Sequence, residues 1–337
     1  MKKATINEIS INIKKSTYLN DYRYCIFNDV INNLTIGSGI SNQSIKKAIL
    51  IALGEFFERE SLFYMCDEVP IINSELILGY SLAQKKIIKI DKKYKNYIFS
   101  DSCGDASHSK SSFCEKNALR EFIERQSLIY NYLSKAKGKR IILNKDIQIK
   151  NILNEFKNIY IYNVSLIDNF YVILATADYN DKFLIGANSS SNKDEAINGA
   201  IKEMYACKIS CNSNMDTQNK KNLDYCDLYT SIPTEKLRAA YSYLKEKSDI
   251  CYYDELNSYE FDVKSMCREL YDEYKINPIL FYMPSTRNIG NLKVAKFFDF
   301  NWFPSLNPNQ FTPEKYDFVE QATDTELDRK CNFIPFP

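Results

Sequence analysis

The chain has 337 residues, of which 45% are hydrophobic and 14% aromatic, and this is enough apolar material to bury a large core. Lys and Arg number 44 against 43 Asp and Glu, a balance that disfavours nucleic acid or an anionic membrane as the main partner. The N-terminus has a glutamate where a secretory signal needs an apolar run, and no segment approaches the roughly 18 apolar residues of a membrane span, so we expect a cytoplasmic protein.

Apolar periodicity predicts helices and strands along the whole chain. In chain order we expect a strand at 22–28, a helix at 44–64, a strand at 86–90, a helix at 112–133, strands at 159–165, 171–177 and 183–187, helices at 193–210 and 234–247, and strands at 279–282 and 294–299, followed by a polar tail. Such a mixture predicts an α/β or α+β layered fold. No Pro, Gly or Ser-rich linker marks a boundary, so we expect a single domain over residues 1–337.

Ten cysteines are scattered through the chain, which suits reduced thiols better than a disulfide framework. Cys103 and Cys114 bracket the only histidine, His108, and Cys207 and Cys211 could share one helix face. A zinc site usually needs paired CxxC spacing, which the sequence lacks. Buried free thiols are therefore the favoured interpretation, with a metal site as the alternative.

An internal repeat is the most informative feature of the sequence. Residues 52–64 (ALGEFFERESLFY) and 118–130 (ALREFIERQSLIY) share nine of thirteen residues. A weaker third copy at 200–208 keeps one glutamate, Glu203, in the corresponding place.

Each strong copy contains the pattern Glu-x-x-Glu-Arg. The residues concerned are Glu55, Glu58 and Arg59 in the first copy and Glu121, Glu124 and Arg125 in the second. Three residues advance a helix by about 300°, so the two glutamates of a pair point to one side. One interpretation is a solvated face stabilised by ion pairs at i,i+4, each contributing roughly 0.2–0.5 kcal/mol.

The alternative is a buried acidic cluster, because aromatic and branched side chains such as Phe56 and Phe122 are interleaved with the glutamates. Clustered carboxylates repel one another unless a cation neutralises them, and carboxylate oxygens favour Mg²⁺, which commonly accompanies nucleotide phosphates. The pattern alone leaves a nucleotide site and a structural ion-pair cluster both open.

Small residues precede both helices, at 37–41 (GSGIS) and at 102–109 (SCGDASHS). We expect turns there, whose backbone N–H groups can cradle an anion at the start of a helix. The sequence contains no GxxxxGK[ST] motif, so an ATP site in this chain is not a P-loop.

Taken in order, these stretches resemble the signature motifs of the YcaO family. Residues 37–41 and 54–59 are similar to the first motif, a GKG-type turn followed by a Glu-x-x-Glu-Arg helix. Residues 102–125 resemble the second motif, and residues 185–203 resemble the third. The last four residues, Ile-Pro-Phe-Pro, are similar to the proline-rich C-terminus of azoline-forming members, in particular the microcin-type synthetase subunits. Two positions depart from the family pattern: Ser38 replaces the usual lysine, and Lys208 stands where some members have an arginine.

The resemblance implies a YcaO-like layered fold with mixed sheets and three glutamate-bearing helices around a nucleotide site. Residues 1–34 would be a lead-in, 35–210 would hold the motif helices and the ATP site, and 211–337 would form the C-terminal part. It assigns ATP-associated Mg²⁺ to Glu55, Glu58, Glu121 and Glu124, and contacts with ATP to Arg59, Ser109, Arg125, Glu203 and Lys208. His108 falls where many members have glycine. It is either a site residue or a structural hydrogen-bonding residue, and both interpretations stay open.

The implied reaction is ATP-dependent cyclodehydration, in which Cys, Ser or Thr of a precursor peptide becomes a thiazoline or oxazoline. The reaction needs a general base, and the C-terminal carboxylate of Pro337 is a candidate because proline restricts the tail. A disordered end is the alternative. The rivals for the function are thioamide or amidine formation by the same family, and a non-catalytic scaffold.

The resemblance also implies partners. Azoline-forming relatives carry or borrow a domain that binds the leader of the precursor peptide, and no long extension precedes the first motif here. We therefore expect a separate leader-peptide-binding partner protein besides the precursor peptide. A flavin-dependent azoline dehydrogenase could then oxidise the rings.

Overall fold

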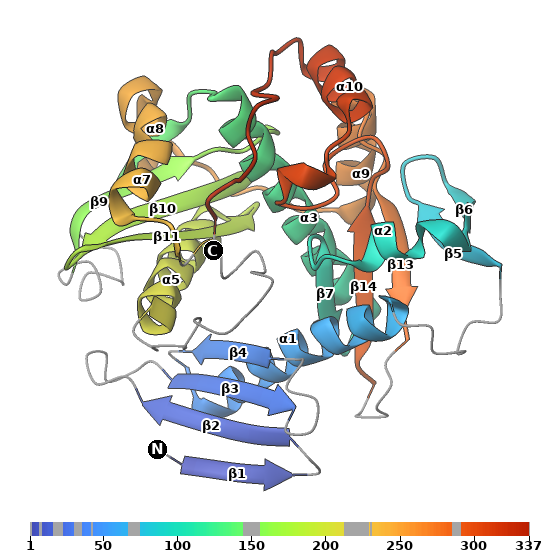
Figure 1. The fold of residues 1–337 in the computed structure, drawn as a ribbon, viewed down its shortest axis with the longest axis horizontal. Coiled ribbons are helices and arrows are strands. Elements are labelled where there is room, and N and C mark those ends of the chain that lie inside the picture. The colour runs from blue at the N-terminus through green and yellow to red at the C-terminus, as the bar shows by residue number, and fades with distance from the viewer. Residues whose placement is uncertain are drawn as a thin grey trace. The chain divides into compact units, whose positions relative to one another are not determined.

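Three β-sheets and the helices that pack on them make up the described part of the computed structural model of this chain (Figure 1). The structure describes residues 2–6, 9–15, 23–29, 36–41, 43–66, 75–143, 156–211, 229, 231–284 and 291–336. The chain divides into two units: Met1–Phe122 with Asp262–Phe300, and Ile123–Phe261 with Asn301–Pro337. We call them unit 1 and unit 2. The single domain expected over residues 1–337 stays a prediction.

Unit 1 begins with an antiparallel sheet in the order β1-β2-β3-β4. Its strands are β1 (Lys2–Ile6), β2 (Ile9–Lys15), β3 (Arg23–Asp29) and β4 (Ile36–Ser41). Helix α1 (Ile45–Cys66) packs along β4 (Figure 1). A β-carbon on Gly37 would lie 2.0 Å from the carbonyl oxygen of Ala52, so only glycine allows strand and helix to approach so closely.

The second sheet of unit 1 is antiparallel in the order β6-β5-β13-β14-β7. Its strands are β5 (Leu76–Ser81), β6 (Lys86–Asp91), β7 (Asp105–His108), β13 (Ile279–Met283) and β14 (Lys293–Phe298). The accompanying helices are η1 (Lys92–Tyr94), α2 (Lys95–Phe99) and α9 (Val263–Tyr274).

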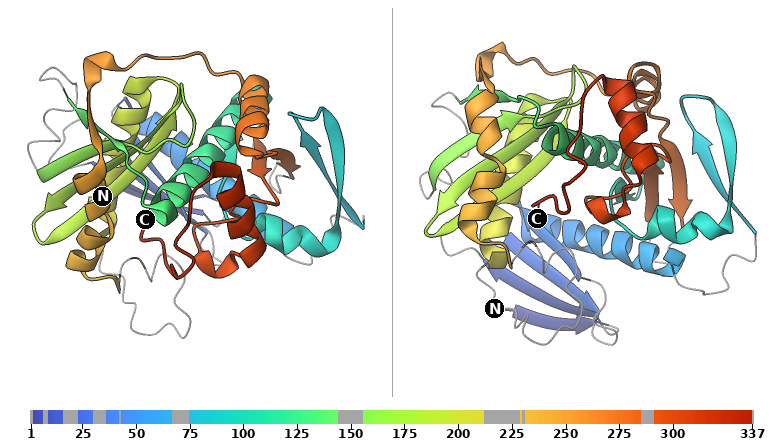
Figure 2. Two further views of the ribbon diagram at one scale, coloured as in Figure 1. Left: turned by 90° about the horizontal axis from the view of Figure 1, so that it is seen from above. Right: turned by 45° about the horizontal axis from the view of Figure 1, so that its top comes forward.

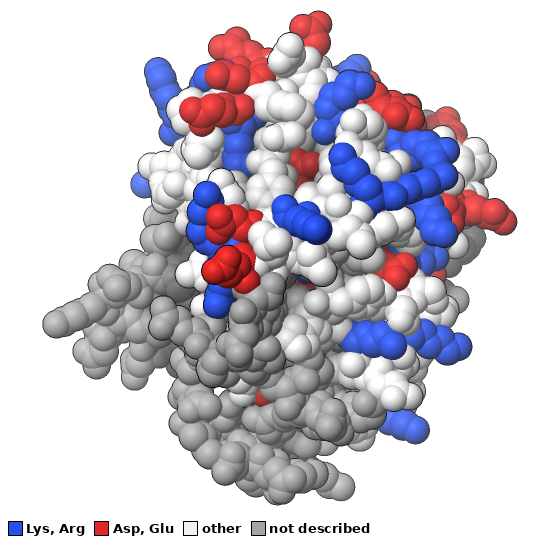
Figure 3. All heavy atoms as spheres, turned by 90° about the vertical axis from the view of Figure 1, so that its right-hand side faces the viewer, with Lys and Arg blue, Asp and Glu red and all other residues white. Residues whose placement is uncertain are grey.

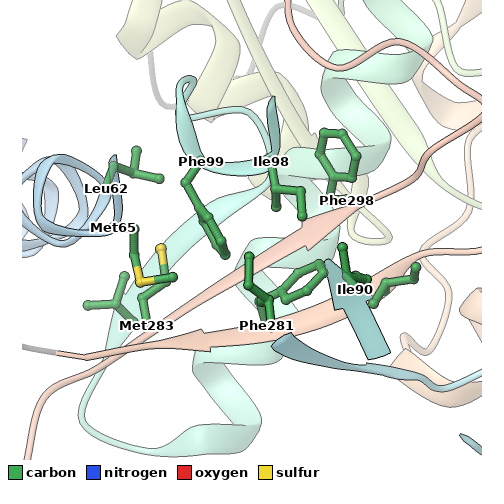
Figure 4. Close-up of a cluster of buried hydrophobic side chains, with 11 residues drawn as sticks. Leu62, Met65, Ile90, Ile98, Phe99, Phe281, Met283 and Phe298 are labelled. Atoms are coloured by element: carbon green, nitrogen blue, oxygen red, sulfur yellow. The ribbon is translucent and has the colours of Figure 1, made fainter. Parts of the chain in front are cut away.

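A hydrophobic core joins this sheet to α1 and α2. Leu62 and Met65 of α1, Phe99 of α2, and Phe281 and Met283 of β13 point toward one another (Figure 4). Each of these five side chains is buried. The core therefore sets the position of α1 against the second sheet.

Helix α3 (Ser111–Ser134) begins in unit 1 and continues into unit 2 beyond Phe122. The sheet of unit 2 has the order β11-β10-β9-β8-β12, antiparallel except for the parallel pair β8–β12. Its strands are β8 (Lys139–Ile142), β9 (Lys157–Asn163), β10 (Tyr171–Tyr179), β11 (Lys182–Ser190) and β12 (Asp249–Tyr252).

Helices cover both sides of the unit 2 sheet. Figure 2 shows it between α5 (Lys193–Cys211) and the pair α7 (Thr234–Ala240) and α8 (Ser242–Lys247). Accordingly, the first seven residues of β10 are all buried. The remaining helices are η3 (Tyr253–Glu255), η4 (Pro308–Gln310) and α10 (Pro313–Thr323).

The predicted fold class is confirmed: sheets and helices form α+β layers, and one of the sheets is mixed. Two expectations for the elements are wrong. The helix expected at 234–247 is broken at Tyr241, and the segment after 299 is not a polar tail, because it forms α10 and buries Trp302 completely. The ammonium of Lys315 donates to the carbonyl oxygen of Trp302 at 2.6 Å and holds α10 against that indole.

Charges of both signs are interspersed on the face drawn in Figure 3, without a single large basic patch. This agrees with the formal charge of +1. Among the described residues, no helix has both the length and the apolar character needed to cross a membrane.

Candidate active site

The first Glu-x-x-Glu-Arg motif lies on α1, and the structure shows what holds its leading glutamate. Glu55 Oε2 accepts hydrogen bonds from the backbone N of Ser38 at 2.6 Å and from the Ser38 hydroxyl at 3.0 Å. Its Oε1 lies 2.5 Å from Nη2 of Arg59. Because β4 is the edge strand of its sheet, the N–H of Ser38 is available to a side chain. Glu55 is thus anchored to β4 by Ser38, the residue that stands where the family pattern has a lysine.

The second glutamate of α1, Glu58, is bound in the same manner by the other sheet of unit 1. Its Oε1 accepts the backbone N–H of Ser107 at 2.6 Å, and Ser107 belongs to β7, the edge strand of that sheet. Surrounding atoms desolvate this carboxyl and raise its pKa to about 7, the hydrogen bond from the Ser107 side chain lowers it, and the charge of Glu55 raises it further. Helix α1 therefore presents one carboxylate to each sheet edge.

The segment between α2 and α3 contains the small residues expected to form a turn. The turn covers only residues 102–104, where Gly104 has a φ of +76°, and residues 105–108 form β7. Residues 37–41 likewise belong to β4 and not to a turn. The turn expected at 37–41 is therefore wrong, and the one expected at 102–109 holds only for residues 102–104. In β4 the small residues permit close packing of strand on helix, as Gly37 does on α1.

Asp105, the first residue of β7, is a candidate site residue that the sequence did not reveal. It is 1% exposed, and burial raises its pKa well above the usual value, with repulsion from Glu58 and Glu121 adding to that effect and Lys296 opposing it. Unit 1 therefore gathers four acidic side chains near one another, from α1, β7 and α3. A single aspartate in a Ser and Gly-rich stretch is typical of turns, and no sequence signal distinguished this one.

Cys114, in the first turn of α3, adjoins this cluster but is a structural thiol. It is buried, and its Sγ donates to the carbonyl oxygens of Ala106 at 3.1 Å and Lys293 at 3.3 Å. Burial, then the charges of Asp105 and Glu58, raise its pKa to about 12, so the thiol stays protonated at neutral pH.

The cysteines of the described residues do not form a metal site. The cysteines that the structure describes as outside any disulfide are Cys66, Cys103, Cys114, Cys207, Cys251, Cys267 and Cys331. No group of three or more His, Cys, Asp or Glu side chains in the described part of the chain is already spaced to hold a metal ion.

The second half of the α3 motif belongs to unit 2. Glu124 is 7% exposed, and its Oε1 lies 3.4 Å from Nη1 of Arg125. The guanidinium of Arg125 stacks over the ring of Phe336, 5.2 Å from the ring centroid. Phe336 is itself buried, and the hydroxyl of Tyr241 donates to the carbonyl oxygen of Pro335 at 2.9 Å. The chain is therefore held in unit 2 as far as Phe336, next to a predicted phosphate-binding arginine. Pro337 lies outside the described residues.

The remaining predicted site residues are less closely connected. Glu203 is an exposed residue of α5, and the side chain of Lys208 lies outside the described residues. Ser109 is exposed between β7 and α3. His108 accepts the backbone N–H of Lys110 through Nδ1 at 3.0 Å.

The donor set of unit 1 suits a hard divalent cation. Glu55, Glu58, Glu121 and Asp105 offer only carboxylate oxygens, which Mg²⁺ prefers. Neither oxygen of Asp105 has a hydrogen-bond partner among the described residues, although the charge of Lys296 attracts this buried carboxyl.

No protein-family model and no curated protein matches the sequence. Solved structures, however, are similar to this chain in three dimensions. A chain of the E. coli Microcin synthetase McbBCD complex is similar at a TM-score of 0.75 and 15% identity, over 100% of both chains. A YcaO from Methanopyrus kandleri bound with AMPPCP and Mg²⁺ is similar at a TM-score of 0.63 and 12% identity, over 86% of this chain and 84% of that chain. A heterocyclase in complex with substrate and cofactor is similar at a TM-score of 0.71 and 12% identity, over 97% of this chain and 55% of that chain. The chain has the YcaO fold, as its motifs predicted.

Proposed function

We propose that this chain is an ATP-dependent cyclodehydratase that converts Cys, Ser or Thr residues of a ribosomal precursor peptide into thiazolines or oxazolines. The observation that carries the proposal is the pair of α1 carboxylates, Glu55 and Glu58, each held by an edge-strand N–H within a YcaO fold. These are the glutamates that the sequence motifs assign to Mg²⁺. A structural ion-pair cluster does not explain why a carboxylate with a pKa near 7 is kept beside Asp105.

In the proposed reaction, the S–H or O–H group of the target residue gives its proton to a general base as it attacks the preceding backbone carbonyl carbon, and a tetrahedral oxyanion forms. The oxyanion takes the γ-phosphoryl group of ATP, and its C–O bond then breaks with release of phosphate and loss of the amide N–H proton. The products are the azoline, ADP and phosphate. Bound Mg²⁺ would neutralise charge on the nucleotide phosphates.

The residues of this chain would position the reactants. We assign Glu55, Glu58, Glu121 and Glu124 to the ATP-associated Mg²⁺, as the sequence motifs imply. Arg59, Arg125, Ser109, Glu203 and Lys208 remain proposed contacts with ATP. Arg125 has the strongest support, because its guanidinium lies over the ring of Phe336, next to the C-terminal residues, and a guanidinium is well suited to phosphate oxygens.

For the general base we propose the C-terminal carboxylate of Pro337. The buried ring of Phe336 and the hydrogen bond from Tyr241 to Pro335 restrain the residues just before it, which favours a positioned chain end over a disordered one. A positioned group of this kind typically contributes 10²–10⁴-fold to the rate.

We further propose that the chain works with partners. One structure that it resembles is the E. coli Microcin synthetase McbBCD complex with pro-MccB17 bound, matched over 100% of both chains at a TM-score of 0.75. By analogy, we expect a precursor peptide, a leader-peptide-binding partner protein and a flavin-dependent azoline dehydrogenase. Free cysteines among the described residues are consistent with our placing it in the cytoplasm.

Mass spectrometry of a candidate precursor peptide, incubated with the chain, its partner protein and ATP, tests the proposal. Each azoline removes one water from the peptide, and the loss should require both ATP and Mg²⁺. Thioamide formation would instead exchange oxygen for sulfur and raise the mass. Peptide that keeps its mass while the chain binds no nucleotide would point to the scaffold and overturn the enzyme assignment.

A further inference from the structure

Asp105 is a buried carboxyl group that the proposed reaction does not use. It is 1% exposed, and neither of its oxygens has a hydrogen-bond partner in the described part of the chain. Lys296 of β14 lies opposite it in the sheet and is completely buried, but its ammonium donates to the carbonyl oxygens of Asp101 and Cys103, each at 2.6 Å. The lysine is thereby hydrogen-bonded to the turn before β7; its charge attracts Asp105, but neither Asp105 oxygen has a hydrogen-bond partner in the described part of the chain.

The register of β7 directs Asp105 toward α1. Alternate residues of a strand face the same side, so Asp105 shares a face with Ser107. Ser107 reaches α1, since its hydroxyl would lie 2.8 Å from a β-carbon on Gly54 and its N–H binds Glu58. Consistent with this placement, Asp105 interacts electrostatically with Glu58 and also with Glu121 of α3. Three carboxyl groups from three different elements of unit 1 therefore surround one region.

A divalent cation is the partner that this arrangement fits. A water molecule could donate to one oxygen of Asp105, and a proton on Asp105 would relieve the repulsion from Glu58, but neither satisfies the oxygens of several carboxylates together. Lys296 is the basic side chain opposite Asp105, and its charge offsets part of the repulsion, but its ammonium is hydrogen-bonded to two carbonyl oxygens. A hard cation removes the repulsion and satisfies several carboxylate oxygens together.

We propose that Asp105 is a further ligand of the divalent cation held by Glu58 and Glu121, so that β7 contributes a carboxylate beside those of the two helices. The inference rests on the proposed function, since that cation is the one that accompanies ATP. Binding requires the three side chains to draw together from their present spacing. Glu58 does so by releasing the N–H of Ser107 and rotating its long side chain, and Glu121 rotates a side chain of the same length, whereas Asp105 has a short one and sets the place toward which they move.

Manganese serves as a paramagnetic probe for the test. The full chain without nucleotide is titrated with Mn²⁺ and free ion is followed by electron paramagnetic resonance, for wild type, Asp105→Asn, Glu58→Gln and Asp299→Asn. We expect Asp105→Asn to weaken Mn²⁺ binding at least about tenfold and to abolish the rise in Tm caused by Mn²⁺. Its metal-free Tm should equal or exceed that of wild type, because a buried carboxyl group without a hydrogen-bond partner in the described part of the chain has been removed.

Asp299→Asn is the matched control. Asp299 is also a buried aspartate of unit 1, at 3% exposure, but its Oδ2 accepts the backbone N–H of Asn277 at 2.7 Å. This variant should lower the metal-free Tm and leave Mn²⁺ affinity unchanged. If Asp105→Asn does not fold, Asp105→Ala is measured by the same titration.

The outcomes separate the two levels of inference. Wild-type Mn²⁺ affinity in the Asp105 variant, with loss of binding in Glu58→Gln, would overturn the role of Asp105 and leave the proposed function standing. A wild-type chain that binds Mn²⁺ neither alone nor with ATP would overturn both. Loss of Mn²⁺ binding in Asp105→Asn and Glu58→Gln, but not in Asp299→Asn, is the supporting result.

Discussion

Glu58 should make the stability of this protein depend on pH in the direction opposite to an ordinary salt-bridged carboxylate. Its pKa rises from 4.5 to about 7 on folding, because burial disfavours the charged form. Between these values the folded state holds a proton that the unfolded state has lost. The contribution of Glu58 is therefore most favourable below about pH 4.5, decreases as the pH rises to 7 and is level above that.

The size of the effect follows from the two pKa values. At about 1.4 kcal/mol per pH unit, the range from 4.5 to about 7 corresponds to about 3 kcal/mol. An unfolding entropy of about 2.1 cal/mol/K per residue over 337 residues gives about 0.7 kcal/mol/K. Ionisation of the buried Glu58 is therefore expected to lower Tm by about 4 °C.

Glu58→Gln removes the charge and keeps an oxygen that can accept the N–H of Ser107. Melting curves in EDTA at pH 4.5, 6 and 8 should show the variant gaining up to about 4 °C on wild type as the pH rises. Glu246→Gln, at an exposed position of α8, controls for the general effect of removing one carboxylate. A difference between Glu58→Gln and wild type that stays constant with pH would refute the assigned burial of Glu58.

Three further outcomes are expected. Gly37→Ala should lower Tm sharply, because its β-carbon would lie 2.0 Å from the carbonyl oxygen of Ala52; circular dichroism melting checks this, and a wild-type Tm would contradict the packing. Glu124→Gln should keep the fold and abolish ATP-dependent ring formation, measured by mass spectrometry, since the amide lacks the charge that Mg²⁺ requires. Extending the chain beyond Pro337 by a few residues should depress ring formation roughly 10²–10⁴-fold while ATP affinity and Tm change little; normal rates would exclude the terminal carboxylate.

The long elements were predictable from sequence because each carries its own pattern. The helix expected at 44–64 is α1, that at 112–133 is α3 and that at 193–210 is α5, each within two residues at both ends. Strands β9, β10 and β11 also agree with expectation. What the sequence could not provide is pairing between distant segments, such as Ile279 of β13 with Ser81 of β5, because neither strand specifies its partner.

The candidate site was predictable to the same extent. The paired glutamates stood out because their motif is repeated. Ser38 and Ser107, whose N–H groups bind Glu55 and Glu58, belong to no such repeated motif. Both serines offer the outward N–H of an edge strand, and edge position depends on the whole sheet. Asp105 was missed for a related reason, since its burial requires the pairing of β7 with β14, in which its partner Lys296 lies 191 residues later.

The close packing of strand on helix explains how α1 can present its carboxylates in fixed positions. In unit 1, Gly37 brings β4 against the backbone of α1, and in unit 2, Gly186 brings β11 equally close to α5, where a β-carbon would lie 2.0 Å from the backbone N of Met204. The sequence repeat relates α1 to α3, whereas this packing relates α1 to α5. A helix in such contact cannot rotate or slide without a backbone clash. Glu55 is therefore held at Ser38 before any ligand arrives, and because α1 is rigid, Glu58 is held at Ser107 by the same constraint.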